Sequence, residues 1–267
     1  MRLTKTKKII CYFVAFIGII GMLVLELGDV MISDKYIYGE WICKTFSRIS
    51  GGIVCIVLMT VLVGTHTTFK HRSGALKRLA IVLPCFAVAV NNIPFLSVEG
   101  ITFFASMREI FLYALFCFSV GFFEEMAFRG CVFTVMLGRM SQTRWGVLIA
   151  SLISSALFGL IHIINLFAGA SVGGVILQVG YSFLIGALCS IVLVKTSNVW
   201  YCVILHSLYN FAGGLASEFG TGKIWTTPTV ILTAVVAVAV TVYTFILWYN
   251  VKKGEIEYVA NGKAEND

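Results

Sequence analysis

The sequence predicts an all-α polytopic membrane protein with about eight transmembrane helices. Of its 267 residues, 59% are hydrophobic and only 12% are charged, whereas soluble domains usually carry about 25% charged residues. The mean hydropathy of +0.94 implies more apolar surface than a single core with a wetted exterior can bury. We therefore interpret the net charge of +7 as a sign of membrane topology and not of nucleic-acid binding.

Apolar runs of about 20 residues identify the expected spans, because a helix of that length crosses a hydrocarbon core of about 30 Å. The first run follows a basic N-terminus but lacks a cleavage site, so we expect a retained span. Asn91, Asn92 and Pro94 interrupt the third run, which indicates a kink or a cavity wall. Gly169 and Gly173 form a GxxxG spacing, which predicts a close approach of helices. The expected spans are residues 9–28, 49–66, 79–98, 109–138, 147–168, 171–194, 198–217 and 227–250.

Short polar links between these runs leave no room for a soluble domain. We therefore expect one integral-membrane domain over residues 1–267, with a catalytic core at about 109–217. The cysteines form no CxxC pair and lie mostly within apolar runs, which is typical of small buried hydrophobic residues.

The distribution of positive charge predicts the orientation. With eight crossings, fourteen of the twenty Lys and Arg residues fall on the side of the N-terminus and five on the other side. Because positive loops stay on the cytoplasmic side, both termini are expected in the cytoplasm. The short loops favour a bacterial plasma membrane.

Three of the expected spans carry polar side chains where lipid should be. A charge at the centre of a spanning helix costs about 2.5 to 3.5 kcal/mol, so such residues are functional candidates. The candidates are Glu124, Glu125 and Arg129 in the fourth span, His162 in the fifth, and His206 and Asn210 in the seventh.

Helical spacing suggests a division of labour among these groups. Glu125 and Arg129 are four residues apart and can pair, whereas Glu124 points to another face of the helix. Two adjacent carboxylates in a low dielectric do not both ionise cheaply, which makes Glu124 a candidate acid or base. His206 and Asn210 share a face and offer two donors to an oxyanion. A structural ion pair and isolated interhelical hydrogen bonds are the alternatives.

In this order and on three separate spans, these groups resemble the motifs of the CPBP family of intramembrane proteases. That family includes the type II CAAX prenyl endopeptidases and the bacteriocin-processing and immunity proteins. The resemblance covers about residues 109–217, and Tyr201 departs from it, because many members have Pro after Trp200. The motifs that carry the resemblance are Glu124-Glu125-x-x-x-Arg129, Phe158-x-x-x-His162 and His206-x-x-x-Asn210.

The resemblance implies a role for each motif. Glu124 with His162 would activate a water for attack on a peptide carbonyl, and His206 with Asn210 would stabilise the oxyanion. The resemblance assigns supporting positions to Glu125 and Arg129.

Metal dependence is left open by the sequence. A glutamate and two histidines can hold a catalytic zinc, and the candidate ligands are Glu124, His162 and His206. The chain has no His-Glu-x-x-His helix, and we favour a glutamate-dependent, metal-free mechanism.

The predicted function is that of an intramembrane endopeptidase surrounded by lipid, with a peptide or protein substrate and no nucleic acid as partner. One alternative is a proton-coupled transporter, because Glu and His chains also relay protons, although the motif-bearing half is not repeated. The other is a bacteriocin-immunity or peptide-binding protein that does not cut. A peptide pheromone or bacteriocin precursor is the expected substrate in a bacterium, and a prenylated protein in a eukaryote.

Overall fold

The computed structural model describes residues 39–64, 67–68, 74–93, 102–167, 169–221 and 226–262, together with Thr6, Ile9 and Phe13. The chain divides into two compact units, and each unit is described here by itself. The first unit consists of Met1–Leu62, Phe86–Met126 and Val203–Val240. The second unit consists of Val63–Cys85, Ala127–Cys202 and Thr241–Asp267.

The all-α class is confirmed. In the described part of the chain, the only strands are the two-residue β1 (Thr102–Phe103) and β2 (Gly220–Thr221), which pair antiparallel. Five helical stretches are long and apolar enough to cross a membrane, as a polytopic membrane protein requires. These stretches are Gly39–Leu62, Met107–Arg139, Arg144–Leu166, Val172–Thr196 and Thr227–Tyr249.

The helices differ from the expected spans in several places. The second begins ten residues earlier than predicted, because α2 (Gly39–Leu62) extends through a charged turn in which Lys44 pairs with Glu40. The seventh expected span is the helix α9 (Trp200–Phe219), which is not among the five apolar stretches. The first expected span, 9–28, lies outside the described residues except for Ile9 and Phe13.

The third expected span is broken into short pieces. It consists of α3 (Ala75–Val82), the 3₁₀ turn η2 (Leu83–Phe86) and α4 (Ala87–Asn91). Pro84 lies within the 3₁₀ turn, and a proline cannot donate a backbone hydrogen bond to a continuous α-helix. The last helical residue is Asn91. Pro94 lies outside the described residues, and the kink or cavity wall predicted at Asn91, Asn92 and Pro94 stays a prediction.

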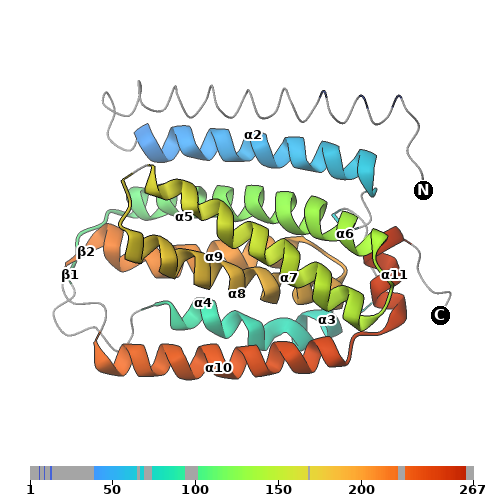
Figure 1. Cartoon of the computed structure of the whole chain (residues 1–267). Coiled ribbons are helices and arrows are strands. Elements are labelled where there is room, and N and C mark those ends of the chain that lie inside the picture. Colours follow the sequence, from blue (N-terminus) through green and yellow to red (C-terminus); the bar gives the residue numbers. More distant parts are fainter. Residues whose placement is uncertain are drawn as a thin grey trace. The chain divides into compact units, whose positions relative to one another are not determined.

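In the first unit, α2 packs against α5 (Met107–Glu125), as Figure 1 shows. Gly52 makes this packing close, because a Cβ atom there would lie 2.2 Å from the ring of Phe122. An aromatic cluster joins α2, α5 and α9: the ring of Tyr113 lies 5.4 Å from the rings of both Trp41 and Phe219. Pairs of rings at such distances stabilise the packing beyond what the burial of their apolar area contributes.

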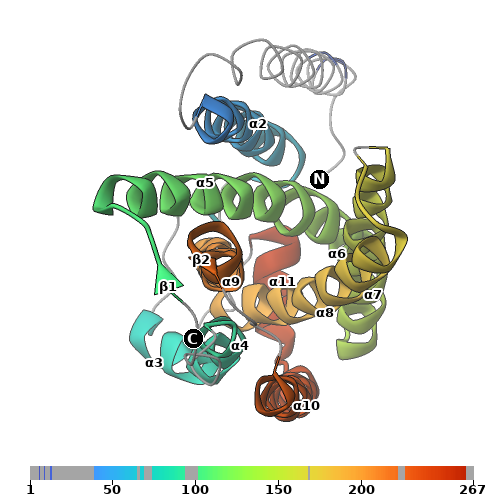
Figure 2. The same ribbon diagram turned by 90° about the vertical axis from the view of Figure 1, so that its left-hand side faces the viewer.

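Two glycines bring α5 and α9 together within the first unit (Figure 2). A Cβ on Gly121 would lie 2.4 Å from Ser207 Oγ, and one on Gly214 would lie 1.7 Å from Tyr113 Oη. The predicted GxxxG approach is wrong, because Gly169 and Gly173 have nothing within 4 Å of a Cβ position. Gly169 instead has a φ of 87° and forms a turn.

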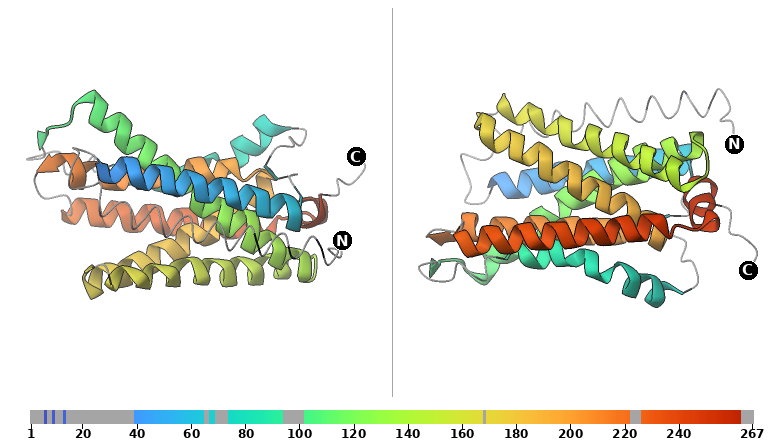
Figure 3. Two further views of the ribbon diagram at one scale, coloured as in Figure 1. Left: turned by 90° about the horizontal axis from the view of Figure 1, so that it is seen from above. Right: turned by 60° about the horizontal axis from the view of Figure 1, so that its bottom comes forward.

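In the second unit, the central helices follow one another directly along the chain. The π-helix η4 (Met126–Phe133) leads into α6 (Thr134–Arg139), and α7 (Arg144–Ile161) continues into the 3₁₀ turn η5 (His162–Leu166). Next comes α8 (Val172–Thr196), which packs against α7 (Figure 3). The side chains of Thr143 and Ser171 accept from backbone N–H groups in the first turns of α7 and α8.

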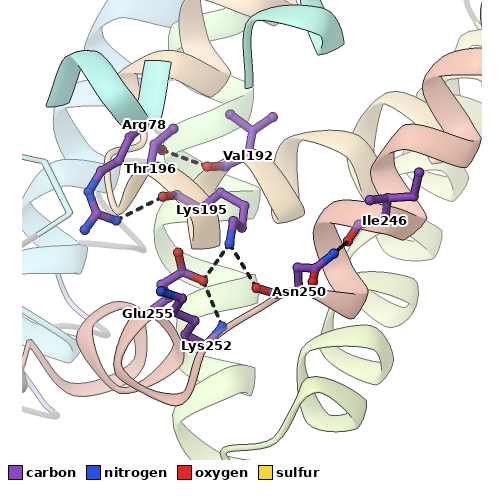
Figure 4. A network of polar contacts seen from close by, with 8 residues as sticks. All are labelled: Arg78, Val192, Lys195, Thr196, Ile246, Asn250, Lys252 and Glu255. Atoms are coloured by element: carbon purple, nitrogen blue, oxygen red, sulfur yellow. Dashed lines mark hydrogen bonds and ion pairs between the residues drawn. The ribbon is translucent and has the colours of Figure 1, made fainter. Parts of the chain in front are cut away.

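The last helices of the second unit are joined by a buried polar network (Figure 4). Lys195, at the end of α8, donates to Glu255 Oε2 at 2.9 Å and to the carbonyl of Asn250 at 3.2 Å. Glu255 belongs to α11 (Lys253–Asn261), and Asn250 follows the end of α10 (Thr227–Tyr249). Arg78 in α3 donates to the carbonyl of Lys195. One ion pair thus fixes α11 to the end of α8.

Candidate active site

In the first unit, the imidazole of His206 lies between two carboxylates. Its Nδ1 is 2.8 Å from Glu125 Oε1, and its Nε2 is 3.6 Å from Glu124 Oε2. The side chain of Glu125 is 0% exposed and that of His206 6%, whereas Glu124 retains 20% exposure. The three groups therefore form a Glu–His–Glu row with its accessible end at Glu124.

The two contacts of His206 differ in kind. The 2.8 Å contact is a hydrogen bond in which Nδ1–H donates to the Glu125 carboxylate. This bond fixes the tautomer and the ring orientation and directs Nε2 toward Glu124. The 3.6 Å contact is longer than a hydrogen bond. A water beside the pair can hydrogen-bond to both atoms.

Close helix packing produces this row. Glu124 and Glu125 lie in the last turn of α5, one turn after Gly121, and His206 precedes Ser207 in α9. Because Gly121 has no side chain, α9 approaches α5 so closely that a Cβ would lie 3.0 Å from the backbone N of Ser207. The Ser207 hydroxyl donates to the carbonyl of Val203, within its own helix, at 2.7 Å.

Asn210 lies one helical turn after His206 in α9 and is half-buried. Side chains four residues apart on an α-helix lie on the same face. The predicted pairing of His206 and Asn210 on one face is therefore consistent with the continuous helix through residues 200–219.

The second unit carries Arg129 within the π-helix η4. Within the expected span 109–138, residues 126–133 are π-helical. In a π-helix the hydrogen bonds run from i to i+5, so residues four apart are not aligned as in an α-helix. The α-helical spacing from which we predicted the pair of Glu125 and Arg129 therefore does not continue beyond Met126, and this pair stays a prediction.

Hydroxyl groups stabilise the backbone of the π-helix. Thr134 Oγ1 donates to the carbonyl of Arg129 at 2.7 Å, and Ser154 Oγ donates to the carbonyl of Phe128 at 3.3 Å. Buried carbonyls need such partners in a membrane, where water is scarce. The two bonds hold the turn that carries Arg129.

Phe158 contacts both functional candidates of the second unit. The Arg129 guanidinium lies over its ring, 4.5 Å from the centroid, and the His162 ring meets it edge-on at 5.2 Å. Arg129 is 0% exposed, so a cation–π contact is a substantial part of its surroundings. Gly186 of α8 provides the space, because a Cβ there would lie 2.5 Å from Arg129 Nη2.

His162 begins the 3₁₀ turn η5, where its Nδ1 lies 2.9 Å from the carbonyl of Phe158. A carbonyl oxygen can only accept, so Nδ1 carries the hydrogen. In the neutral ring, Nε2 therefore holds the lone pair and can act as a base.

Sequence reasoning missed two contacts of the site. We assigned Glu125 only to Arg129, whereas its Oε1 binds His206, and we gave Phe158 no role. The first contact depends on the approach of α5 to α9, for which Gly121, three residues before Glu124, is the only local signal. The four-residue spacing of Phe158 and His162 was the available signal for the second.

The donor set of the first unit fits part of a metal site. Glu124 Oε2 and His206 Nε2 are 3.6 Å apart, which suits two ligands of one zinc ion. The bond from Nδ1 to Glu125 is the kind that orients a metal-bound imidazole. A bound zinc would lower the pKa of a coordinated water. The third candidate ligand, His162, belongs to the second unit.

The comparison with protein families identifies the region that carries these side chains. Residues 106–212 match the family model described as Rce1-like, type II CAAX prenyl endopeptidase. This range includes all six predicted site residues, and it confirms the resemblance that the three motifs indicated. No curated protein and no solved structure matches the chain significantly.

Proposed function

Because this chain belongs to the CPBP family of CAAX-type intramembrane proteases, which are peptide hydrolases, we propose that it hydrolyses a peptide bond in a membrane-associated peptide with the Glu124, His206 and Asn210 side chains. The observation that carries the assignment is the row in which Glu125 binds His206 Nδ1 while Nε2 faces Glu124. The attack of water on a carbonyl needs a base and two hydrogen-bond donors. Glu124 on α5 would be the base, and the oriented imidazole and the Asn210 amide, one turn apart on α9, would be the donors.

In the proposed reaction, Glu124 removes a proton from a water as its oxygen attacks the scissile carbonyl carbon. The carbonyl oxygen becomes an oxyanion, which accepts hydrogen bonds from His206 Nε2–H and the Asn210 amide. When the C–N bond breaks, the proton held by Glu124 passes to the leaving amine. The products are a carboxylic acid, which then releases its proton to water, and a free amine.

Glu125 supports this reaction through His206. Its carboxylate accepts from Nδ1–H, so an imidazole that also donates from Nε2 to the oxyanion carries both ring hydrogens. The resemblance assigns the role of second base to His162, and the bond from its Nδ1 to Phe158 leaves a lone pair on Nε2 for that role. Arg129 keeps its proposed supporting role in the second unit.

The proposed setting is the cytoplasmic side of a bacterial plasma membrane, with both termini in the cytoplasm. The basic loops of the sequence support this orientation. We propose a peptide pheromone or a bacteriocin precursor as the substrate. The match to the type II CAAX prenyl endopeptidase model supports a second substrate class, proteins that end in a prenylated C-a-a-X box.

The test compares the peptides of cells that contain the wild-type chain, Glu124→Gln or His206→Ala at matched levels in the membrane. Mass spectrometry of the secreted and membrane-bound peptides should show at least one cleavage product that is lost with both variants. In parallel, purified protein in nanodiscs is given one quenched fluorescent peptide with a farnesylated C-a-a-X end and one without.

Each other outcome contradicts the proposal in a different way. Cleavage that persists in both variants would remove Glu124 and His206 from the reaction. Protection against a peptide toxin that survives Glu124→Gln would favour an immunity protein that binds without cutting. Proton-dependent flux in liposomes, without any cleavage product, would favour a transporter.

A further inference from the structure

The broken third span ends in two adjacent asparagines, and each binds a different helix of the first unit. Asn91 Nδ2 donates to Thr233 Oγ1 in α10 at 3.1 Å. Asn92 Nδ2 donates to the backbone carbonyl of Tyr209 in α9 at 3.0 Å. Amide groups within a membrane protein are costly unless they are hydrogen-bonded, so these bonds hold the end of α4 against both helices.

The contact between Asn92 and α9 is close at the level of the backbone. A Cβ on Gly213 would lie 2.7 Å from Asn92 Nδ2 and 3.4 Å from its Cγ. Any larger residue at Gly213 would displace the side-chain amide of Asn92. In an α-helix the carbonyl of Tyr209 also accepts from the N–H of Gly213, so Asn92 adds a second hydrogen bond to one backbone oxygen.

The carbonyl that Asn92 binds belongs to the residue directly before Asn210. His206 lies one turn earlier on the same helix, where its bond to Glu125 fixes one point of the helix. A single fixed point does not determine how the next turn is rotated. The Asn92 contact supplies a second fixed point at the turn that carries Asn210.

We propose that Asn92 is a positioning residue, which binds the Tyr209 carbonyl against Gly213 and thereby directs the Asn210 amide toward the oxyanion. This inference rests on the proposed function, in which Asn210 stabilises the oxyanion. A donor that points at the oxyanion acts mainly in the transition state. Loss of Asn92 should therefore lower kcat and leave KM nearly unchanged.

Asn91 provides a matched control. It is the same residue type, one position earlier, with a hydrogen bond of similar length, but its partner Thr233 is on a helix without a predicted site residue. The variants Asn92→Leu and Asn91→Leu each keep the side-chain volume roughly constant and remove one amide donor. A role in folding alone would lower the thermal stability of both variants and spare kcat in both.

The first experiment measures kcat and KM of the full chain in nanodiscs, with the farnesylated quenched peptide as the probe. Asn92→Leu should lower kcat about 3- to 10-fold, the range expected for one lost hydrogen bond, and Asn91→Leu should lower it less than about 2-fold. Hydrogen exchange, read by mass spectrometry without substrate, should rise over residues 207–215 only in Asn92→Leu.

A second pair of variants tests the contact with Gly213. Gly213→Ala should lower kcat by displacing the amide, whereas the double variant Gly213→Ala, Asn92→Ala should be no slower than Asn92→Ala alone, because the clash is gone. Additive losses would contradict a shared contact.

The outcomes separate this inference from the function on which it rests. An active wild type in which Asn92→Leu and Asn91→Leu have equal kcat and equal exchange in α9 would overturn the positioning role and leave the proposed function intact. A wild type that cleaves neither the probe nor any cellular peptide would overturn the proposed function and this inference with it.

Discussion

His206 Nδ1 lies 2.8 Å from Glu125 Oε1, and both side chains are buried. This bond orients the imidazole, and it leaves Glu124, at 3.6 Å from Nε2 and 20% exposed, as the more accessible of the two carboxylates. We therefore propose different tasks for these two adjacent residues of one helix, because their environments differ.

The Glu125–His206 bond predicts a graded effect of carboxylate removal. Glu125→Gln keeps the size of the side chain and removes its charge, so it should lower kcat about 10- to 100-fold, as lost orienting carboxylates do. Glu124→Gln should abolish detectable cleavage, because it removes the base itself. Peptide cleavage at matched protein levels measures both. Equal activity of Glu125→Gln and the wild type would contradict the orienting role.

The sequence was sufficient for the residue types of this site but not for their contacts. Helical spacing placed Asn210 one turn after His206. It also assigned Glu124 and Glu125 to different faces of the helix, whereas both carboxylates lie beside the imidazole of His206. It could not reveal which neighbour Glu125 meets, because that depends on how closely α9 approaches α5 at Gly121.

For the fold, the sequence predicted where most helices lie but not where their hydrogen-bond pattern changes. Hydrophobic length located most helices within a few residues, because crossing a membrane sets a minimum length. Local backbone chemistry caused the misses. The 3₁₀ turn at Pro84 and the π-helix around Arg129 change the hydrogen-bond pattern within an apolar run, and hydropathy does not detect such changes.

Gly121 should tolerate no side chain. In Gly121→Ala the new Cβ would lie 2.4 Å from Ser207 Oγ and 3.1 Å from the carbonyl of Val203. We expect a loss of about 1 to 3 kcal/mol of stability from overpacking, together with lower activity, because α5 carries Glu124. Gly180→Ala is the control, since nothing lies within 4 Å of its Cβ position. Thermal unfolding in detergent measures the difference, and equal melting temperatures would refute the close contact.

Activity should withstand metal removal. A carboxylate base with an oriented imidazole can activate water without a metal ion, and the chain has no His-Glu-x-x-His motif. Dialysis against 1,10-phenanthroline should leave the rate of peptide cleavage unchanged. A loss of activity that zinc restores, with about one zinc ion bound per chain, would instead assign Glu124 and His206 as ligands.

Replacing Phe158 should reduce peptide cleavage more than replacing its aromatic neighbour Phe128. Phe158→Leu removes the ring that lies 4.5 Å from the Arg129 guanidinium and that meets His162 edge-on. We expect the free energy of unfolding to fall by about 0.5 to 2 kcal/mol from the cation–π contact alone. Peptide cleavage should also be slower. Phe128→Leu is the control, because the Phe128 ring packs on Phe158 at 4.9 Å. Equal losses of activity in the two variants would show that general packing explains both.

The pair of Lys195 and Glu255 should contribute far more to stability than a second Lys–Glu pair on the same terminal helix. Lys195→Met leaves the Glu255 carboxylate buried without its cation and should cost about 3 to 5 kcal/mol. Adding Glu255→Gln removes that charge and should restore part of the loss. Lys253 and Glu257 also pair, but Lys253 is 73% exposed, so Lys253→Met should cost at most about 1 kcal/mol. Unfolding in detergent measures all three variants. Comparable losses for Lys195→Met and Lys253→Met would mean that water reaches the inner pair, and α11 would then be held by its apolar contacts instead.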